Sequence, residues 1–171
     1  MPDLINFPTG DSEWIVLHAR PRCEKRILDV CQQQGAVGYL PVRRKTHKYG
    51  GRVREFTSPL FSGYAFALVD PRQKAFLRQN RNVANILDVV DQGTLVRQLQ
   101  QIRVALESGN DIEVLPYLEI GRIVRLAHGP LRGLEGRVTR IKGRSRIVVN
   151  VDMIRESVAV EIDLSWLDPA S

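Results

Sequence analysis

The sequence predicts an α+β fold in two domains, an antiparallel sheet flanked by helices and then a small all-β barrel. Two observations carry this prediction. Strand-like and helix-like segments alternate through residues 1–107, whereas from Arg122 onward only short segments rich in β-branched residues occur, separated by glycine and proline. We therefore expect a first domain at residues 1–107, a linker at 108–118 and a barrel domain at 119–171.

In the first domain, residues 14–19 (WIVLHA) predict a short buried strand. Pro21 then stands where a helix can begin and Gly35 where it can end, with apolar side chains at helical spacing between them. On such a helix Cys23 and Cys31 lie about 12 Å apart along the axis. A disulfide needs Cα atoms closer than about 7 Å, so both cysteines are expected to be reduced thiols.

The remaining elements of the first domain follow from turn signals and periodicity. Basic arms on either side of Tyr49-Gly50-Gly51 predict a hairpin, and Asp70-Pro71 closes the next strand. The expected segments are a hairpin at 39–57, a strand at 60–69, a short helix at 72–79, a strand at 82–90 and an amphipathic helix at 95–106.

The second domain is expected to be all β. Four or five short strands within about 50 residues favour a closed barrel, because closure removes exposed strand edges. The segment before them has no periodic pattern and holds Gly109, Asn110 and Pro116, so we expect a linker there. The expected strands are residues 122–127, 134–141, 146–153 and 157–162.

Composition limits the class of protein. The 171 residues are 43% hydrophobic and 26% charged, ordinary values for a globular protein in water, and the net charge of +6 favours a polyanionic partner. No apolar run approaches the roughly 18 to 20 residues of a membrane span. Residues 1–13 lack the basic and apolar regions of a signal peptide. We therefore expect a cytoplasmic monomer that does not associate with membranes.

The pattern contains no set of residues for catalysis. The three histidines, His18, His47 and His128, are far apart in the sequence. No nucleophile, phosphate-loop, zinc or paired-carboxylate motif occurs. We expect neither a metal nor a cofactor, and no enzymatic activity.

Basic residues gather in the hairpin. Residues 43–54 (RRKTHKYGGRVR) hold six lysines or arginines, with His47 and Tyr49, and no acid. Such a segment is either a solvated tip or a contact for a nucleic-acid backbone, whose binding releases counterions. Arg20 and Arg22 precede a helix N-terminus, which favours phosphate, although solubility alone also accounts for them. The candidate nucleic-acid-binding residues are Arg20, Arg22, Arg43, Arg44, Lys45, Lys48, Arg52 and Arg81.

The first half of the barrel is also basic. This half either faces RNA or is the outward side of strands whose apolar residues turn inward. Its basic residues are Arg132, Arg137, Arg140, Lys142, Arg144 and Arg146.

Residues 58–70 (SPLFSGYAFALVD) hold three aromatics within six residues. Phe61, Tyr64 and Phe66 either belong to a buried strand or face a partner, and Gly63 permits a bulge between them. The alternation alone leaves both possibilities open.

Taken in order, these segments resemble the NusG family of transcription elongation factors over nearly the whole chain. The WIVL strand leads into a helix and a basic hairpin, and PLFSGYAF at 59–66 is similar to the family's PLFPGYVFV-type strand. Residues 81–83 (RNV) stand at the place of an Arg-Gly-Val-like turn, and GPLRGLEGRV at 129–138 is similar to the KOW signature. The resemblance implies an NGN domain joined to a KOW barrel.

The resemblance also implies a function. In the family the aromatic strand grips the clamp helices of the RNA polymerase β′ subunit, so the implied clamp-binding residues are His18, Phe61, Tyr64 and Phe66. Such a protein contacts upstream or non-template DNA and modulates pausing and termination by favouring one polymerase conformation. Its KOW domain recruits a further partner, the ribosome or the terminator Rho.

Departures from the family pattern indicate a specialised paralogue of the RfaH or UpxY antiterminator type. Ser62 replaces the family's usual proline, Asn82 its usual glycine, and residues 153–156 (MIRE) stand where general members have Ile-Phe-Gly-Arg. We expect the KOW domain to stay a β-barrel rather than become a helical hairpin, because it is rich in β-branched residues. The KOW residues expected to bind a partner are Met153, Ile154 and Arg155.

A second function stays open, that of a KOW-containing RNA-binding or ribosome-associated protein without a polymerase role. The charge suits ribosomal RNA, but nothing in that class accounts for residues 1–107 or the aromatic strand. Salt dependence distinguishes the two functions, because ribosome binding weakens with salt in proportion to phosphate contacts whereas an apolar clamp contact survives.

Overall fold

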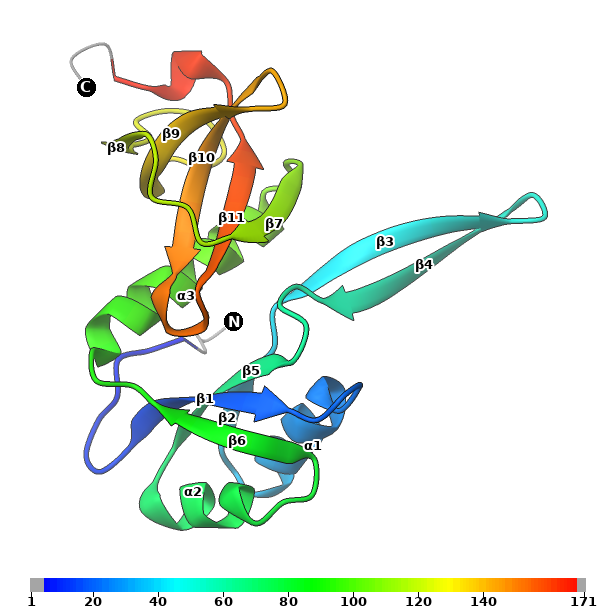
Figure 1. The fold of residues 1–171 in the computed structure, drawn as a ribbon, viewed down its shortest axis with the longest axis vertical. Helices are drawn as coiled ribbons and strands as arrows, with labels where there is room; N and C mark the ends of the chain where they lie inside the picture. The colour runs from blue at the N-terminus through cyan, green and yellow to red at the C-terminus, as the bar shows by residue number, and fades with distance from the viewer. Residues whose placement is uncertain (1–4, 169–171) are drawn as a thin grey trace. The chain divides into compact units, whose positions relative to one another are not determined.

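The computed structural model describes residues 5–168 and divides the chain into two compact units, Met1–Gly93 and Thr94–Ser171 (Figure 1). Within the described residues it has three α-helices, eleven strands and three antiparallel sheets. The first unit mixes helices and strands and the second carries an all-β sheet, so the predicted α+β class is confirmed. Helix α3 (Gln92–Glu107) groups with the second unit from Thr94 onward, so the boundary lies earlier than residue 107.

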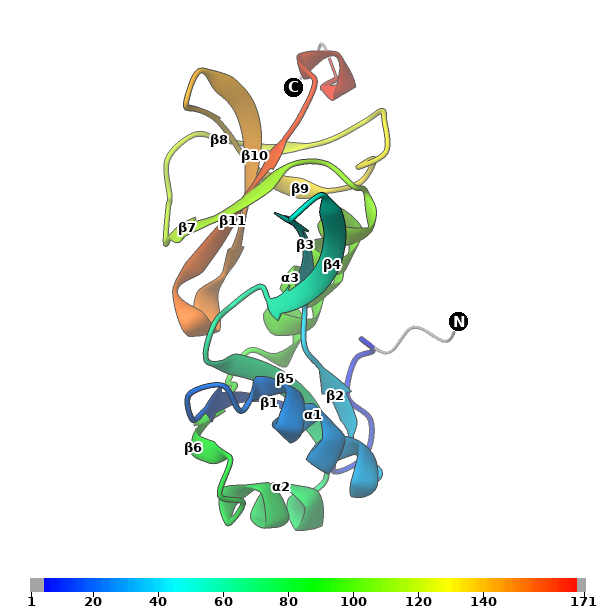
Figure 2. The same ribbon diagram turned by 90° about the vertical axis from the view of Figure 1, so that its right-hand side faces the viewer.

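The first unit is built on a four-stranded sheet with strand order β2-β5-β1-β6. Ile15 and Leu17 of β1 and Ala67 of β5 form one core cluster with Ile27 of α1 and Leu77 of α2. Because strand side chains alternate, one sheet face carries these residues and both helices cover it (Figure 2). The elements are β1 (Glu13–Ala19), α1 (Glu24–Gln33), β2 (Val37–Tyr39), β5 (Tyr64–Val69), α2 (Pro71–Arg78) and β6 (Val83–Asp88).

Trp14 is anchored on both its side chain and its backbone. The indole N–H donates to the Asn6 carbonyl at 2.8 Å, and Ile5 nearby in sequence is fully buried. The ladder between β1 and β6 ends at Ile15, so no strand pairs with Trp14 on that side. The Gln92 amide takes its place, accepting from the Trp14 N–H at 2.7 Å and donating to its carbonyl at 2.9 Å.

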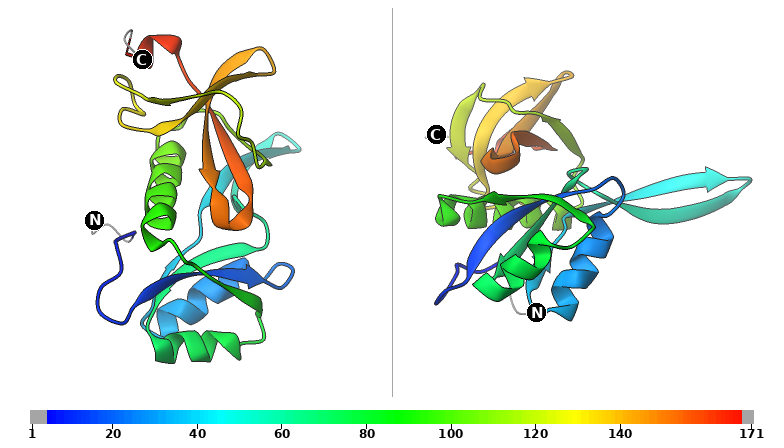
Figure 3. Two further views of the ribbon diagram at one scale, coloured as in Figure 1. Left: turned by 60° about the vertical axis from the view of Figure 1, so that its left-hand side comes forward. Right: turned by 60° about the horizontal axis from the view of Figure 1, so that its bottom comes forward.

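The predicted hairpin is present as a separate two-stranded sheet, β3 (Val42–Tyr49) and β4 (Arg52–Pro59). Figures 1 and 3 show it as a long arm of the first unit. Gly50 and Gly51 have φ of 52° and 82°. A two-residue hairpin loop of this left-handed kind requires such values, and glycine adopts them without steric cost.

The second unit contains a five-stranded sheet with strand order β7-β11-β10-β9-β8. The four strands expected after Arg122 are present, but the expected linker at 108–118 contains a fifth strand, β7, which pairs with β11. The sequence did not indicate β7 because IEVLP is short and does not alternate, and its partner lies far along the chain. The strands are β7 (Ile112–Pro116), β8 (Arg122–Arg125), β9 (Glu135–Ile141), β10 (Arg144–Val151) and β11 (Glu156–Glu161).

Arg146 is the buried charge of this sheet. Its side chain is 6% exposed, with Nη2 at 3.3 Å from the Asp111 carboxylate and Nη1 at 3.9 Å from that of Glu113. Within the described residues, its Nε and Nη1 make no hydrogen bond. A guanidinium in this position depends on its two carboxylates to offset the cost of losing water.

Removing both carboxylates should destabilise the protein more than removing the arginine. Asp111→Asn combined with Glu113→Gln leaves a buried guanidinium without a counter-charge, at an expected cost of about 3 kcal/mol in urea unfolding. Arg146→Met keeps apolar volume and removes the charge, and should cost about 1 kcal/mol or less. Equal losses from the two variants would contradict this account of Arg146.

Candidate functional site

His18 and Tyr64 form an accessible aromatic pair in the first unit. The antiparallel register places His18 near the end of β1 opposite Tyr64 at the start of β5, so both side chains lie on one face of the sheet. Their ring centroids are 5.2 Å apart with an interplanar angle of 24°, so the rings stack. His18 is exposed and Tyr64 half-buried, so the pair offers a partner an aromatic surface with polar edges.

The two phenylalanines of the same segment are buried. Phe66 is 0% exposed and Phe61 1%. Phe66 follows Tyr64 by two residues in β5 and shares its sheet face, whereas Phe61 lies in the turn at 60–63. Of the four expected clamp-binding residues, the structure brings His18 and Tyr64 together at the surface and leaves Phe61 and Phe66 in packing positions.

A hollow of about 760 Å³ adjoins the His18 side chain. Its lining includes the basic side chains of Arg20, Arg22 and Lys25. The backbone N–H of Arg20 donates to the Asn82 carbonyl at 2.9 Å, so the turn that carries Arg81 lies beside Arg20. Arg81, which is far along the chain from Arg20 and Arg22, therefore lies near them at the edge of the hollow.

Glu24 is a buried carboxylate of this hollow, with 7% of the residue exposed. Its Oε1 accepts a hydrogen bond from the backbone N–H of Gly63 at 3.0 Å. Gly63 has a φ of 89°, which glycine adopts without steric cost. The bond ties the start of α1 to the turn between Phe61 and Tyr64. Sequence reasoning missed Glu24, because its partner is 39 positions away and nothing local indicates the contact.

The hairpin carries the second group of basic residues. Arg43 is half-buried and the others are exposed, with Arg44 at 3.7 Å from the Glu55 carboxylate. Lys25 of α1 donates to the Thr57 carbonyl at 3.3 Å and so connects the base of the hairpin to the rim of the hollow. The expected nucleic-acid-binding residues thus fall into two groups, Arg20, Arg22 and Arg81 at the hollow, and Arg43, Arg44, Lys45, Lys48 and Arg52 on the hairpin.

The three residues expected to bind a partner in the second unit have different surroundings. Ile154 is 7% exposed and belongs to the core, and Met153 is half-buried. Arg155 is exposed, with its guanidinium carbon 4.0 Å from the centre of the Tyr117 ring. The Tyr117 hydroxyl donates to Asp152 at 2.9 Å, and burial together with that carboxylate raises the pKa of Tyr117 to about 12. Arg155 is therefore the most accessible of the three.

Packing explains two of the three glycines in GPLRGLEGRV. A Cβ at Gly136 would collide with the Val148 carbonyl of the neighbouring strand, and one at Gly129 with the Trp166 indole. Leu131, at 0% exposure, lies in the core between these glycines. Gly133 has open space around it and a φ of 89°, which glycine adopts without steric cost.

Carboxylates neutralise half of the basic residues that the sequence suggests for RNA binding. Three of the six side chains lie within ion-pair distance of an acid. The pairs are Lys142 with Glu113 at 2.9 Å, Arg144 with Glu161 at 2.9 Å, and Arg146 with Asp111 at 3.3 Å. Charged side chains of this unit therefore form ion pairs within the fold as well as contributing to its surface charge.

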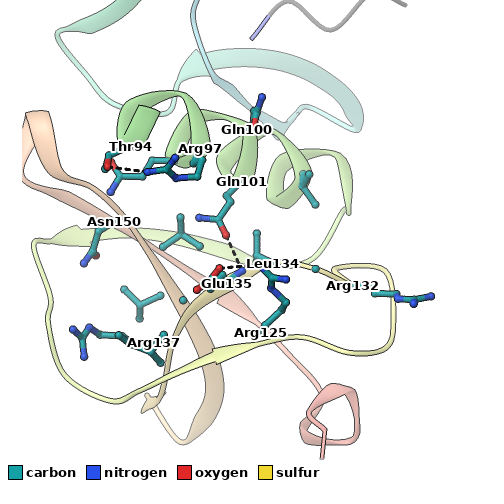
Figure 4. A pocket seen from close by; sticks show the side chains of 17 residues that line it. Thr94, Arg97, Gln100, Gln101, Arg125, Arg132, Leu134, Glu135, Arg137 and Asn150 are labelled. Atoms are coloured by element: carbon teal, nitrogen blue, oxygen red, sulfur yellow. Dashed lines mark hydrogen bonds and ion pairs between the residues drawn. The ribbon is translucent and has the colours of Figure 1, made fainter. Parts of the chain in front are cut away.

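A second hollow, of about 550 Å³, lies within the second unit between α3 and the sheet (Figure 4). The Gln101 Oε1 of α3 accepts from the Glu135 backbone N–H at 2.7 Å, and Arg125 lies 3.2 Å from the Glu135 carboxylate. The arginines that line the hollow are Arg97, Arg125, Arg132 and Arg137. Its surface is suited to an anionic partner.

Residues 5–168 hold no candidate metal cluster and no candidate membrane-spanning helix. No group of three or more His, Cys, Asp or Glu side chains is placed there to hold a metal ion. No helix of that part is long and apolar enough to cross a membrane. The expectation that the protein needs no cofactor stays a prediction.

Glu24→Ala should destabilise the protein more than Glu24→Gln. Glutamine keeps an acceptor for the Gly63 N–H, whereas alanine leaves a buried donor unpaired, at an expected cost of about 1–3 kcal/mol. Urea unfolding of the two variants measures the difference. Equal free energies of unfolding would contradict an anchoring role for this hydrogen bond.

Comparison with known protein families gives a match that includes most of the first unit. A family model described as "Transcription termination factor nusG" matches residues 12–111, which include every element from β1 to α3 and contain the aromatic pair, the first hollow and the hairpin. No curated protein matches the chain. The family match covers more than half of the 171 residues, and the chain belongs to the NusG family.

Proposed function

We propose that this protein is a transcription elongation and antitermination factor that binds the RNA polymerase clamp with its first unit. The NusG family consists of transcription factors that bind RNA polymerase and are not enzymes. The stacked pair of His18 and Tyr64 at the surface is the observation that carries the proposal. Stacked aromatic rings offer a protein helix a large rigid contact at low cost in side-chain entropy.

The proposed effect on transcription is mechanical. A protein that binds one polymerase conformation more tightly than another shifts the balance toward the first. A tenfold preference corresponds to about 1.4 kcal/mol, which a few well-packed aromatic contacts supply. Phe61 and Phe66 are buried packing residues and are not part of the proposed contact surface.

In the proposed complex, upstream or non-template DNA meets the basic groups of the first unit. Arg20, Arg22 and Arg81 line or flank the hollow beside the aromatic pair, and the hairpin base is joined to the hollow by Lys25. A transcription complex can therefore contact the aromatic pair with its clamp and the cationic groups with its DNA at the same time. Each phosphate contact makes binding more salt-dependent.

The second unit acts in this proposal as a KOW domain that recruits the ribosome or Rho. Support comes from GPLRGLEGRV, which is similar to the KOW signature, and from the exposed Arg155. The absence of the family's Ile-Phe-Gly-Arg at 153–156 favours a specialised paralogue of the RfaH or UpxY type. We further propose that the protein acts in the cytoplasm as a monomer.

The arginine-lined hollow of the second unit favours one alternative, an RNA-binding or ribosome-associated protein without a polymerase role. Ion pairs at Lys142, Arg144 and Arg146 weaken this alternative, since those charges are already neutralised. This alternative also gives no role to the first unit, which carries most of the family match.

Capture of core RNA polymerase by the full chain in moderate salt tests the proposal. Tyr64→Ala and His18→Ala should each lower capture by about tenfold, because each removes one ring of the stacked surface, at about 1–2 kcal/mol. Phe76→Ala is the matched control, an aromatic of α2 that is 46% exposed.

Each variant is first checked for folding by circular dichroism. Wild-type protein that fails to capture polymerase would overturn the proposal. Capture that Phe76→Ala weakens as much as Tyr64→Ala does would overturn the assigned surface.

A further inference from the structure

The two faces of the hairpin differ in their chemistry. Directly opposite residues of an antiparallel pair project to the same side, so the register with Tyr49 opposite Arg52 assigns each side chain to a face. What we call the ladder face carries Arg43, Lys45, His47, Tyr49, Arg52, Arg54, Phe56 and Ser58. The opposite face carries Val42, Arg44, Thr46, Lys48, Val53, Glu55, Thr57 and Pro59.

On the ladder face, three successive cross-strand pairs each join a ring to a cation. The pairs are Tyr49 with Arg52, His47 with Arg54, and Phe56 with Lys45. The rings stack on one another, with centroid distances of 5.1 Å from His47 to Tyr49 and 5.7 Å from His47 to Phe56. Tyr49 is 60% exposed and Phe56 40%, so the stack is open to a ligand.

Charge separates the faces as clearly as the rings do. The ladder face has four cations and no acid. The opposite face has Arg44 and Lys48 together with Glu55, the one acid of the two strands, which lies 3.7 Å from Arg44. An anion with flat apolar groups therefore matches the ladder face and not the opposite face.

We propose that the ladder face binds single-stranded nucleic acid, with bases stacked on the rings and phosphates held by the flanking cations. Exposed aromatics beside a cationic track are the usual means of binding unpaired strands. Bases of a duplex already stack on each other, which leaves no free face for the rings. Successive rungs are two residues apart, about 6.8 Å, which equals about two base steps of a stacked strand.

This inference rests on the proposed nucleic-acid contact and deepens it. It names the hairpin face that binds, the single-stranded form of the nucleic acid, and the stacking of its bases on the rings. The sequence put Arg54 in the basic segment 43–54 but assigned neither Arg54 nor Phe56 to one face of the hairpin. Both follow from the pairing register, which places them opposite His47 and Lys45.

Two double variants of the full chain separate the faces at equal net charge. Lys45→Gln with Arg52→Gln removes two cations from the ladder face, and Lys48→Gln with Arg44→Gln removes two from the opposite face. A third variant, Tyr49→Leu with Phe56→Leu, keeps apolar bulk for the hairpin and removes two of the three rings, those on either side of His47. The probes are a fluorescein-labelled oligo-dT of about 15 nucleotides, the matching duplex and an abasic strand of the same length, each titrated by anisotropy without polymerase.

The single strand should bind more tightly than the duplex and the abasic strand. The ladder-face charge variant should lose about tenfold in affinity, with a salt slope shallower by about 1.4, while the opposite-face variant loses less than about threefold. The ring variant should also lose about tenfold, with an unchanged salt slope, and should bind the abasic strand as the wild type does.

Equal losses from the two charge variants would overturn the proposal, as would tighter binding to duplex or an unaffected ring variant. A wild-type protein that binds no oligonucleotide would also overturn it. Polymerase capture is measured separately, so failure of the ladder face and failure of the proposed clamp contact are distinguishable.

Discussion

The two-residue period of the β-strand decides which surfaces this protein can offer a partner. In β5 this period puts Tyr64 and Phe66 on one sheet face, where Tyr64 stacks with His18 at the strand's exposed start and Phe66 is buried further along. In the hairpin, Gly50 and Gly51 set the register from one end, and the distribution of rings and charges over two faces follows from that loop. A slip by one residue would move every one of these side chains to the other side.

Polar anchors hold these surfaces in place within the first unit. Glu24 fixes the turn that precedes Tyr64, and Lys25, its neighbour on α1, contacts the base of the hairpin. One turn of a single helix therefore reaches both the aromatic pair and the cationic arm. Such a scaffold suits a protein that acts by binding, because its contribution is to hold contact groups in a fixed arrangement before the partner arrives.

Turn and helix-capping signals in the sequence predicted much of the fold. Asp70-Pro71 marks α2, where the Asp70 carboxylate accepts from the Gln73 N–H at 2.8 Å, and the glycine pair marks the hairpin. Contacts between distant segments could not be predicted from local signals. Among them are the pairing of β7 with β11 and the hydrogen bond between Glu24 and Gly63, and the burial of Phe61 likewise depends on the tertiary fold. The run of cations in the hairpin was visible in the sequence, whereas its division between two faces required the register. The family resemblance of the first unit was visible too, and the family match at residues 12–111 supports it.

Photocrosslinking in an assembled elongation complex would show whether Tyr64 contacts the polymerase. A photoreactive phenylalanine analogue is placed at Tyr64, at Phe56 or, as control, at Phe76 of the full chain. We expect position 64 to crosslink to the polymerase β′ subunit and position 56 to an unpaired DNA strand, while position 76 crosslinks to neither. Position 64 crosslinking to no polymerase subunit, or no more than position 76 does, would contradict the proposed clamp contact.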